Sequence, residues 1–171
     1  MIETMPIVME TRPAAYAVII EQGKILLTRF LPTHAPERAA WTLPGGGMEP
    51  PEQPEHTVKR EVFEETGYLI KTDGLLGLHA LHLPLEKHQK MPFCALRMVY
   101  RAHIIAGKLT HETDGSSDQA RWIPIEELEN IPKLSLLEDV ARMMGYRNIT
   151  DWVQQQLSNQ LTDERNTAHE S

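Results

Sequence analysis

Apolar residues alternate or cluster in several short segments that predict β-strands. Residues 14–20 and 24–30 are rich in aliphatic side chains and flank Gln22-Gly23, a dipeptide typical of a tight turn. These two segments predict a β-hairpin. Four further segments have a similar character and predict strands: 41–43, 75–83, 93–106 and 120–123.

Two other segments have the spacing and the end signals of helices. In the first, Pro54 suits the first helical position and Gly67 suits the residue after the last one, so a helix is predicted over residues 54–66. In the second, Ser135 and Glu138 form a capping-box signature, and apolar residues follow at helical spacing. Strands combined with helices predict an α/β fold, in which helices cover a mixed sheet.

Length and composition indicate one globular domain. The chain has 171 residues, of which 41% are hydrophobic and 24% are charged. We expect the domain, with a short N-terminal lead, at residues 1–146, followed at 147–171 by a C-terminal helix and a mobile polar tail. Apolar runs are too short for a membrane span and the first ten residues lack a positive region, so we expect a cytoplasmic protein without a membrane partner.

Charge and cysteine content narrow the range of ligands. The formal net charge is -7, which argues against general binding of nucleic acids and indicates that a bound phosphate is accompanied by a cation. Cys94 is the only cysteine, which excludes an intramolecular disulfide or a cysteine-based zinc site, and we expect it to be buried.

Glu61, Glu64 and Glu65 share one face of the first predicted helix. At 100° per residue, Glu64 lies about -60° and Glu65 about +40° from Glu61 around the axis. Val58 and Val62 lie beside them, at about +60° and +100°. The acidic face therefore borders the predicted core.

The common explanation for such an acidic run is a solvated helix face. Against it, the three carboxylates repel each other near the negative end of the helix dipole, at roughly 3 kcal/mol per pair about 6 Å apart. Helical ion pairs recover only a few tenths of a kcal/mol. We therefore expect a hard divalent cation, Mg²⁺ or Mn²⁺, at this face, and we expect Arg60 to orient Glu64.

The residues in and around this helix resemble the Nudix box, the signature of the Nudix hydrolase family. The signature runs Gly, five residues, Glu, seven residues, Arg-Glu, an aliphatic residue, any residue, Glu-Glu, any residue, Gly and an aliphatic residue. This chain supplies Gly46, Glu52, Arg60, Glu61, Val62, Glu64, Glu65, Gly67 and Tyr68, of which only the aromatic Tyr68 departs from the pattern. A chance match has a probability on the order of 10⁻⁷ over the chain.

The resemblance implies an α/β/α sandwich around a mixed sheet, and hydrolysis of a nucleoside diphosphate linked to another group with Mg²⁺ or Mn²⁺ as cofactor. It implies that Glu61, Glu64 and Glu65 are catalytic and bind the metal, together with the carbonyl of Gly45. Supporting roles are implied for Gly46, Glu52, Arg60 and Gly67. The general base stays open among Glu61, Glu65 and an acid of the loop 112–118, with Glu112 and Asp118 as candidates for an extra ligand or base.

Residues outside the box bear on the identity of the substrate. Pro84 stands at a position similar to that of a proline in ADP-ribose pyrophosphatases, so we expect ADP-ribose or a nucleotide sugar. Arg29 and Arg38 are candidate phosphate-binding residues. Three aromatic residues are candidates for stacking on a base, with burial in the core as the alternative: Tyr16, Phe30 and Trp41.

Two other functions stay open. A Nudix hydrolase could instead act on dinucleoside polyphosphates, capped RNA or oxidised nucleoside triphosphates. A non-catalytic module that senses nucleotides or binds a partner is the alternative of another class, and the intact trio Glu61, Glu64 and Glu65 argues against it. An oligomer is compatible with the sequence, but no feature of the sequence supports one.

Overall fold

The computed structural model describes residues 8–83, 91–111, 115 and 117–169, with side chains described as far as residue 160. The strands are β1 (Glu10–Val18), β2 (Ile20–Glu21), β3 (Lys24–Phe30), β4 (Ala40–Thr42), β5 (Gly45–Gly47), β6 (Tyr68–Leu83), β7 (Phe93–Gly107) and β8 (Ser117–Pro124). The helices are α1 (Pro54–Thr66), α2 (Leu136–Met143) and α3 (Ile149–His169), with short 3₁₀ turns at Pro36–Arg38 and Ile125–Glu127.

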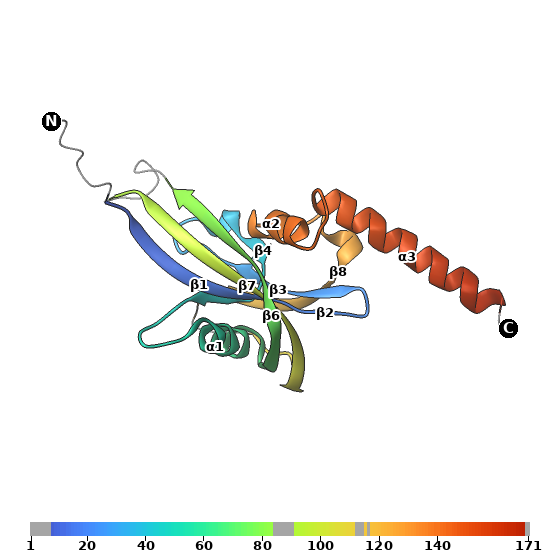
Figure 1. Cartoon of the computed structure of the whole chain (residues 1–171), viewed down its shortest axis with the longest axis horizontal. Coiled ribbons are helices and arrows are strands. Elements are labelled where there is room, and N and C mark those ends of the chain that lie inside the picture. Colours follow the sequence, from blue (N-terminus) through green and yellow to red (C-terminus); the bar gives the residue numbers. More distant parts are fainter. Residues whose placement is uncertain (1–7, 84–90, 112–114, 116, 170–171) are drawn as a thin grey trace.

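The strands form two neighbouring four-stranded sheets (Figure 1). The first has the order β5-β1-β7-β6, in which β1 and β7 run parallel while the other pairs are antiparallel. In the second, β3 pairs with β8 along one edge and with β2 and β4 along the other. The prediction of a mixed sheet is confirmed.

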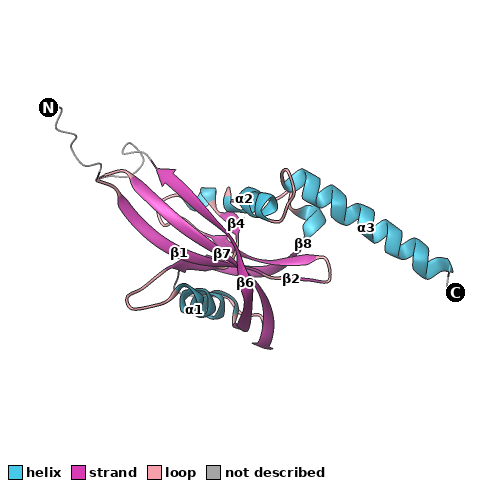
Figure 2. Ribbon diagram, in the orientation of Figure 1, coloured by secondary structure: helices cyan, strands magenta, loops and turns pink. Residues whose placement is uncertain are grey.

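Helices cover the strands from opposite sides, as Figure 2 shows. On one side, Val58 and Val62 of α1 pack against Ala15 and Ala17 of β1. On the other side, α2 and the first turns of α3 bury a second cluster that includes Val18, Leu27 and Trp152. The expected α/β/α sandwich is confirmed.

The predicted hairpin is only partly present. Gln22 and Gly23 do form the turn, with positive φ angles of 50° and 73°, but across it only Ile20 and Glu21 pair with β3. The rest of the predicted strand, β1, pairs with β5 and β7 instead. Because Ala15 and Ala17 are buried, this run is a central strand, and central strands pair with segments that are distant in the sequence.

Helix α1 has the predicted bounds. It begins at Pro54, and Gly67 ends it in the left-handed conformation, with φ of 74° and its N–H bonded to the carbonyl of Phe63. The prediction of a capping box for α2 is wrong, because the backbone of Ser135 is already helical and its side chain makes no cap hydrogen bond. Glu138 instead accepts a hydrogen bond of 3.1 Å from the N–H of Ile149, which joins α2 to α3.

The glycine run at 45–47 is a strand, although such a run usually forms a turn. Its residues pair with Ala14, Ala15 and Tyr16 of β1. A Cβ atom on Gly45 would overlap the carbonyl oxygen of Ala15, so the strands approach this closely only because glycine is present.

Helix α3 extends away from the sandwich towards the C-terminus (Figure 1). Its buried residues among those with described side chains lie in its first turns, at Ile149, Trp152 and Val153. The backbone is helical as far as His169, and the mobility expected for the polar tail stays a prediction. Cys94 is buried, as predicted, and within the described residues no helix is long and apolar enough to cross a membrane.

Candidate functional site

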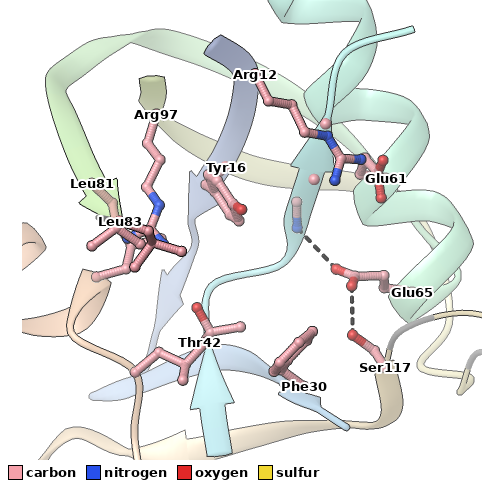
Figure 3. Close-up of a pocket in the computed structure, with 15 residues that line it drawn as sticks. Arg12, Tyr16, Phe30, Thr42, Glu61, Glu65, Leu81, Leu83, Arg97 and Ser117 are labelled. Atoms are coloured by element: carbon pink, nitrogen blue, oxygen red, sulfur yellow. Dashed lines mark hydrogen bonds between the residues drawn. The ribbon is translucent and has the colours of Figure 1, made fainter. Parts of the chain in front are cut away.

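A cavity of about 510 Å³ lies between strands of both sheets, α1 and the segment that leads into α2 (Figure 3). This volume falls within the range of small-molecule sites. The lining residues are Arg12, Tyr16, Phe30, Thr42, Gly45, Gly46, Gly47, Glu61, Glu65, Leu81, Leu83, Arg97, Ser117, Leu134 and Leu136. Four of the residues singled out from the box and its flank, namely Gly45, Gly46, Glu61 and Glu65, therefore meet in one cavity.

Glu65 is the most deeply buried acid of the box, with 4% of its surface exposed. It continues the buried stripe of Val58 and Val62 at helical spacing, so α1 turns it towards the sheet. Its carboxylate accepts hydrogen bonds from the N–H of Gly45 at 2.9 Å and from the hydroxyl of Ser117 at 2.6 Å. A longer bond of 3.4 Å comes from the hydroxyl of Thr28. Donors from three different strands thus hold this carboxylate at the cavity wall.

Glu61 lies directly beneath the glycine strand. A Cβ atom on Gly46 would come within 2.6 Å of the Glu61 carboxylate carbon, so a larger residue at position 46 would displace this side chain. The side chain is 18% exposed, and its carboxylate accepts a hydrogen bond of 2.9 Å from Arg60. Glu61 therefore lines the cavity, and its carboxylate is fixed by Arg60.

Glu64 is not among the residues that line the cavity; 46% of its side chain is exposed, and it pairs with Arg60 at 3.1 Å. The three glutamates share a face of α1, but they do not converge. Among the described residues, no group of three histidine, cysteine, aspartate or glutamate side chains has the geometry of a metal site.

Arg60 connects the helix to the segment that precedes it. Its guanidinium donates to both carboxylate oxygens of Glu52, at 2.5 and 3.0 Å, and to the carbonyl of Gly47 at 3.2 Å. The bonds from Arg60, followed by one from the N–H of Glu49 and one from Thr57, lower the pKa of Glu52 to about 2. This network fixes the glycine strand against α1.

These contacts change the interpretation of the repulsion among Glu61, Glu64 and Glu65, from which a bound cation was expected. Arg60 lies among Glu52, Glu61 and Glu64, and hydrogen-bond donors surround Glu65. The chain itself therefore relieves the repulsion between the carboxylates, and a divalent cation is not needed to explain the fold. A metal ion, where bound, would be held by the residues that line the cavity.

Other predicted site residues lie outside the cavity. Arg29 and Asp118 form a two-pronged ion pair, in which the Arg29 Nε lies 2.8 Å from Asp118 Oδ1. Hydrogen bonding to Arg29 lowers the pKa of Asp118, which makes it a weaker base. Arg38 is exposed on a 3₁₀ turn and lies 4.0 Å from Glu37. Neither arginine reaches the cavity where we expected phosphate to bind.

The remaining candidate residues also divide into those that line the cavity and those that do not. Tyr16 and Phe30 line the cavity, whereas Trp41 belongs to the core and carries the Arg121 guanidinium 5.6 Å from its ring centre. Gly67 serves as the cap of α1. Two candidates, Glu112 and Pro84, lie outside the described residues.

Several residues that line the cavity or bind Glu65 were not predicted from the sequence. Thr28 and Ser117 reach Glu65 from 37 and 52 residues away, and no local pattern marks them. Arg12 and Arg97 line the cavity as well. The apolar run at 93–106 contains two charged residues, Arg97 and Arg101, and the sequence alone does not show which of them faces the cavity.

The chain is similar in sequence and in fold to known proteins. Residues 10–143 match the NUDIX domain. An ADP-ribose pyrophosphatase of Methanocaldococcus jannaschii is 30% identical over 122 residues, which cover 71% of this chain and 65% of that protein. A MutT-like protein of Streptomyces ambofaciens is 40% identical over 65 residues, or 38% of this chain and 39% of that protein.

Among solved structures, a NUDIX hydrolase from Nitrosomonas europaea has the same fold, with a TM-score of 0.66. The match is 21% identical and covers 79% of this chain and 88% of the other. The chain thus spans less than two thirds of the two curated relatives, but the domain match covers most of its own length. This chain belongs to the Nudix family.

Proposed function

We propose that the chain is a Mg²⁺- or Mn²⁺-dependent hydrolase that cleaves the pyrophosphate linkage of a nucleoside diphosphate joined to another group. The observation that carries this proposal is that Glu61 and Glu65 of the box face the same cavity, beside a backbone without side chains at Gly45–Gly47. The cavity, with a volume of about 510 Å³, suits a ligand of nucleotide size.

The residues at the cavity fit a hard cation. Mg²⁺ is usually held by one or two carboxylates together with substrate phosphates and water, and Glu61 and Glu65 supply two carboxylates. We assign these two as the principal ligands, with the carbonyl of Gly45 as an additional one. Glu64 is exposed and paired with Arg60, so it would have to leave this pair and turn towards the cavity to serve as a further ligand. A bound cation would neutralise phosphate charge and lower the pKa of the attacking water.

The chain's own groups would orient the substrate and the ligands. Ser117, Thr28 and the Gly45 N–H fix Glu65, while Arg60 and Glu52 hold the glycine strand in place. Glu61 and Glu65 stay candidates for the proton acceptor. Asp118 is the weaker candidate among the described acids, because Arg29 engages both of its oxygens and favours its ionised form.

Apolar and aromatic walls suit the remainder of a nucleotide. Tyr16 and Phe30 offer rings, and Leu81, Leu83 and Leu134 limit the access of water. We favour ADP-ribose or a nucleotide sugar as substrate, and the similarity to an ADP-ribose pyrophosphatase over most of the chain supports this preference.

A substrate panel with Mg²⁺ tests the proposal. We expect ADP-ribose or nucleotide sugars to be hydrolysed faster than nucleoside triphosphates, dinucleoside polyphosphates and capped RNA. Products formed in ¹⁸O-labelled water identify the phosphorus that is attacked. In the Glu65→Gln variant, turnover should fall by roughly 100-fold or more. Faster turnover of triphosphates would refute the substrate preference, and full activity in the variant would refute the role of Glu65.

A further inference from the structure

Two nitrogens of the Arg97 guanidinium lack hydrogen-bond partners inside the cavity. They are Nε and Nη1, both of which are buried, and neither has a partner in the described part of the chain. Arginine stays charged at every accessible pH, and buried polar atoms in native proteins are nearly always paired. A ligand that carries negative charge would supply the missing contacts.

The position of Arg97 follows from the register of the sheet. On β7 it lies opposite Ala14 of the parallel strand β1 and opposite His79 of β6. Arg12 and Tyr16 stand two residues before and after Ala14, so strand alternation places them on the same face as Arg97. The small side chain of Ala14 leaves this face open between the two arginines.

Arg97 and the carboxylate of Glu61 lie on different sides of Tyr16 in the cavity. In Figure 3, the Tyr16 ring lies between Arg97 on one side and Arg12 with Glu61 on the other. Burial raises the pKa of the Tyr16 hydroxyl; Arg97 and Arg12 oppose this shift, while Glu65 and Glu61 add to it. The charges of Arg97, Arg12, Glu65 and Glu61 therefore all affect the pKa of this hydroxyl.

Apolar side chains close the space around the Arg97 guanidinium. Leu81 and Leu83 of β6 lie beside its end in Figure 3. Because these side chains keep water away, a contact between Arg97 and an anion is stronger than it would be on an open surface. At the other end, the Arg12 guanidinium lies against Gly47, where a Cβ atom would overlap it.

We propose that Arg97, across Tyr16 from Glu61, and Arg12, on the same side of Tyr16 as Glu61, bind the phosphate oxygens of the substrate. This assignment rests on the proposed function, since it places the diphosphate between Arg97 and the carboxylates that hold the cation, with Arg12 beside these carboxylates. It replaces Arg29 and Arg38 as the phosphate-binding residues. Arg97 thereby selects ligands with a phosphate group over the corresponding nucleoside.

Calorimetric titration of the whole chain with ADP in EDTA tests the assignment without metal or turnover, so its outcome does not depend on whether the protein hydrolyses any substrate. We expect Arg97→Met to weaken ADP binding by about 10-fold to 100-fold, the usual effect of losing hydrogen bonds to a charged group. Arg101→Met is the matched control, because Arg101 is an exposed arginine of the same strand outside the cavity, and it should bind ADP like the wild type.

Two further measurements test whether the loss of affinity in Arg97→Met is specific to the phosphate groups of ADP. Adenosine should bind the wild type and Arg97→Met equally, because it lacks the phosphates. Arg97→Lys keeps the charge without the planar fork and should lose less affinity for ADP than Arg97→Met. The proposal is overturned if Arg97→Met binds ADP like the wild type, if adenosine binding falls as much as ADP binding, or if the wild type does not bind ADP in EDTA.

Discussion

The acids of the box divide into two groups according to whether they line the cavity. Glu61 and Glu65 line it, and Glu61 also contacts Arg60, whereas Glu52 and Glu64 contact Arg60 without lining the cavity. The helical wheel predicted the shared face of Glu61, Glu64 and Glu65 and its border with the core. It could not predict Arg60 as the centre of the network, because the bond to Glu52 depends on the path of the chain before the helix.

The pair between Glu52 and Arg60 should make the stability of the protein depend on pH. Folding lowers the pKa of Glu52 from 4.5 to about 2, so the ionised carboxylate stabilises the fold above pH 4.5. This contribution is lost as the pH falls from 4.5 towards 2. The Tm of Glu52→Gln should therefore lie below that of the wild type at pH 7, and the difference should shrink through this window.

Thermal unfolding at a series of pH values measures this difference. Glu55→Gln is the matched control, because Glu55 lies three residues further on, in the first turn of α1, in an exposed pair with Lys59 at 3.8 Å, and such pairs contribute little. A Tm difference for Glu52→Gln that is the same at pH 7 and at the lowest pH where the protein folds would contradict the account.

At the scale of elements, local signals predicted α1 well and the strand pairing poorly. Pro54 and Gly67 marked both ends of the helix because each acts on its own backbone. The apolar run at 14–20 indicated a strand, but its partners β5 and β7 are set by burial on both faces. Ser135 failed as a cap because its backbone is already helical where α2 begins.

Gly67 provides a test of this local control. In Gly67→Ala, the left-handed backbone costs about 1 to 2 kcal/mol, and the new Cβ atom would also come within 2.6 Å of the carbonyl oxygen of Lys108. Gly145→Ala is the control, since Gly145 also has a positive φ but a Cβ atom added there would meet nothing within 4 Å. Urea denaturation should show a larger loss of unfolding free energy for Gly67→Ala, and equal losses would refute the steric part of the argument.

At the scale of the whole molecule, the cavity exists only because remote segments meet. Its walls come from β1, β3, β4, β5, α1, β6, β7, β8 and α2, and the hydrogen bond from Ser117 to Glu65 joins residues 52 positions apart. The box motif predicted the family fold and the residues on α1. The positions of Arg12, Arg97 and the leucines in the cavity depend on the register of the sheet, which no local pattern in this sequence specifies.

The central claim is that Glu61 and Glu65 together hold a divalent cation at this cavity, and titration of the protein with Mn²⁺, followed by electron paramagnetic resonance, tests it most directly. We expect the wild type and the control Glu55→Gln to bind Mn²⁺ equally well. In Glu61→Gln and Glu65→Gln, which each remove one carboxylate ligand, the Kd should rise by roughly 10-fold or more. Absence of Mn²⁺ binding by the wild type, or unchanged binding in both cavity variants, would contradict the account.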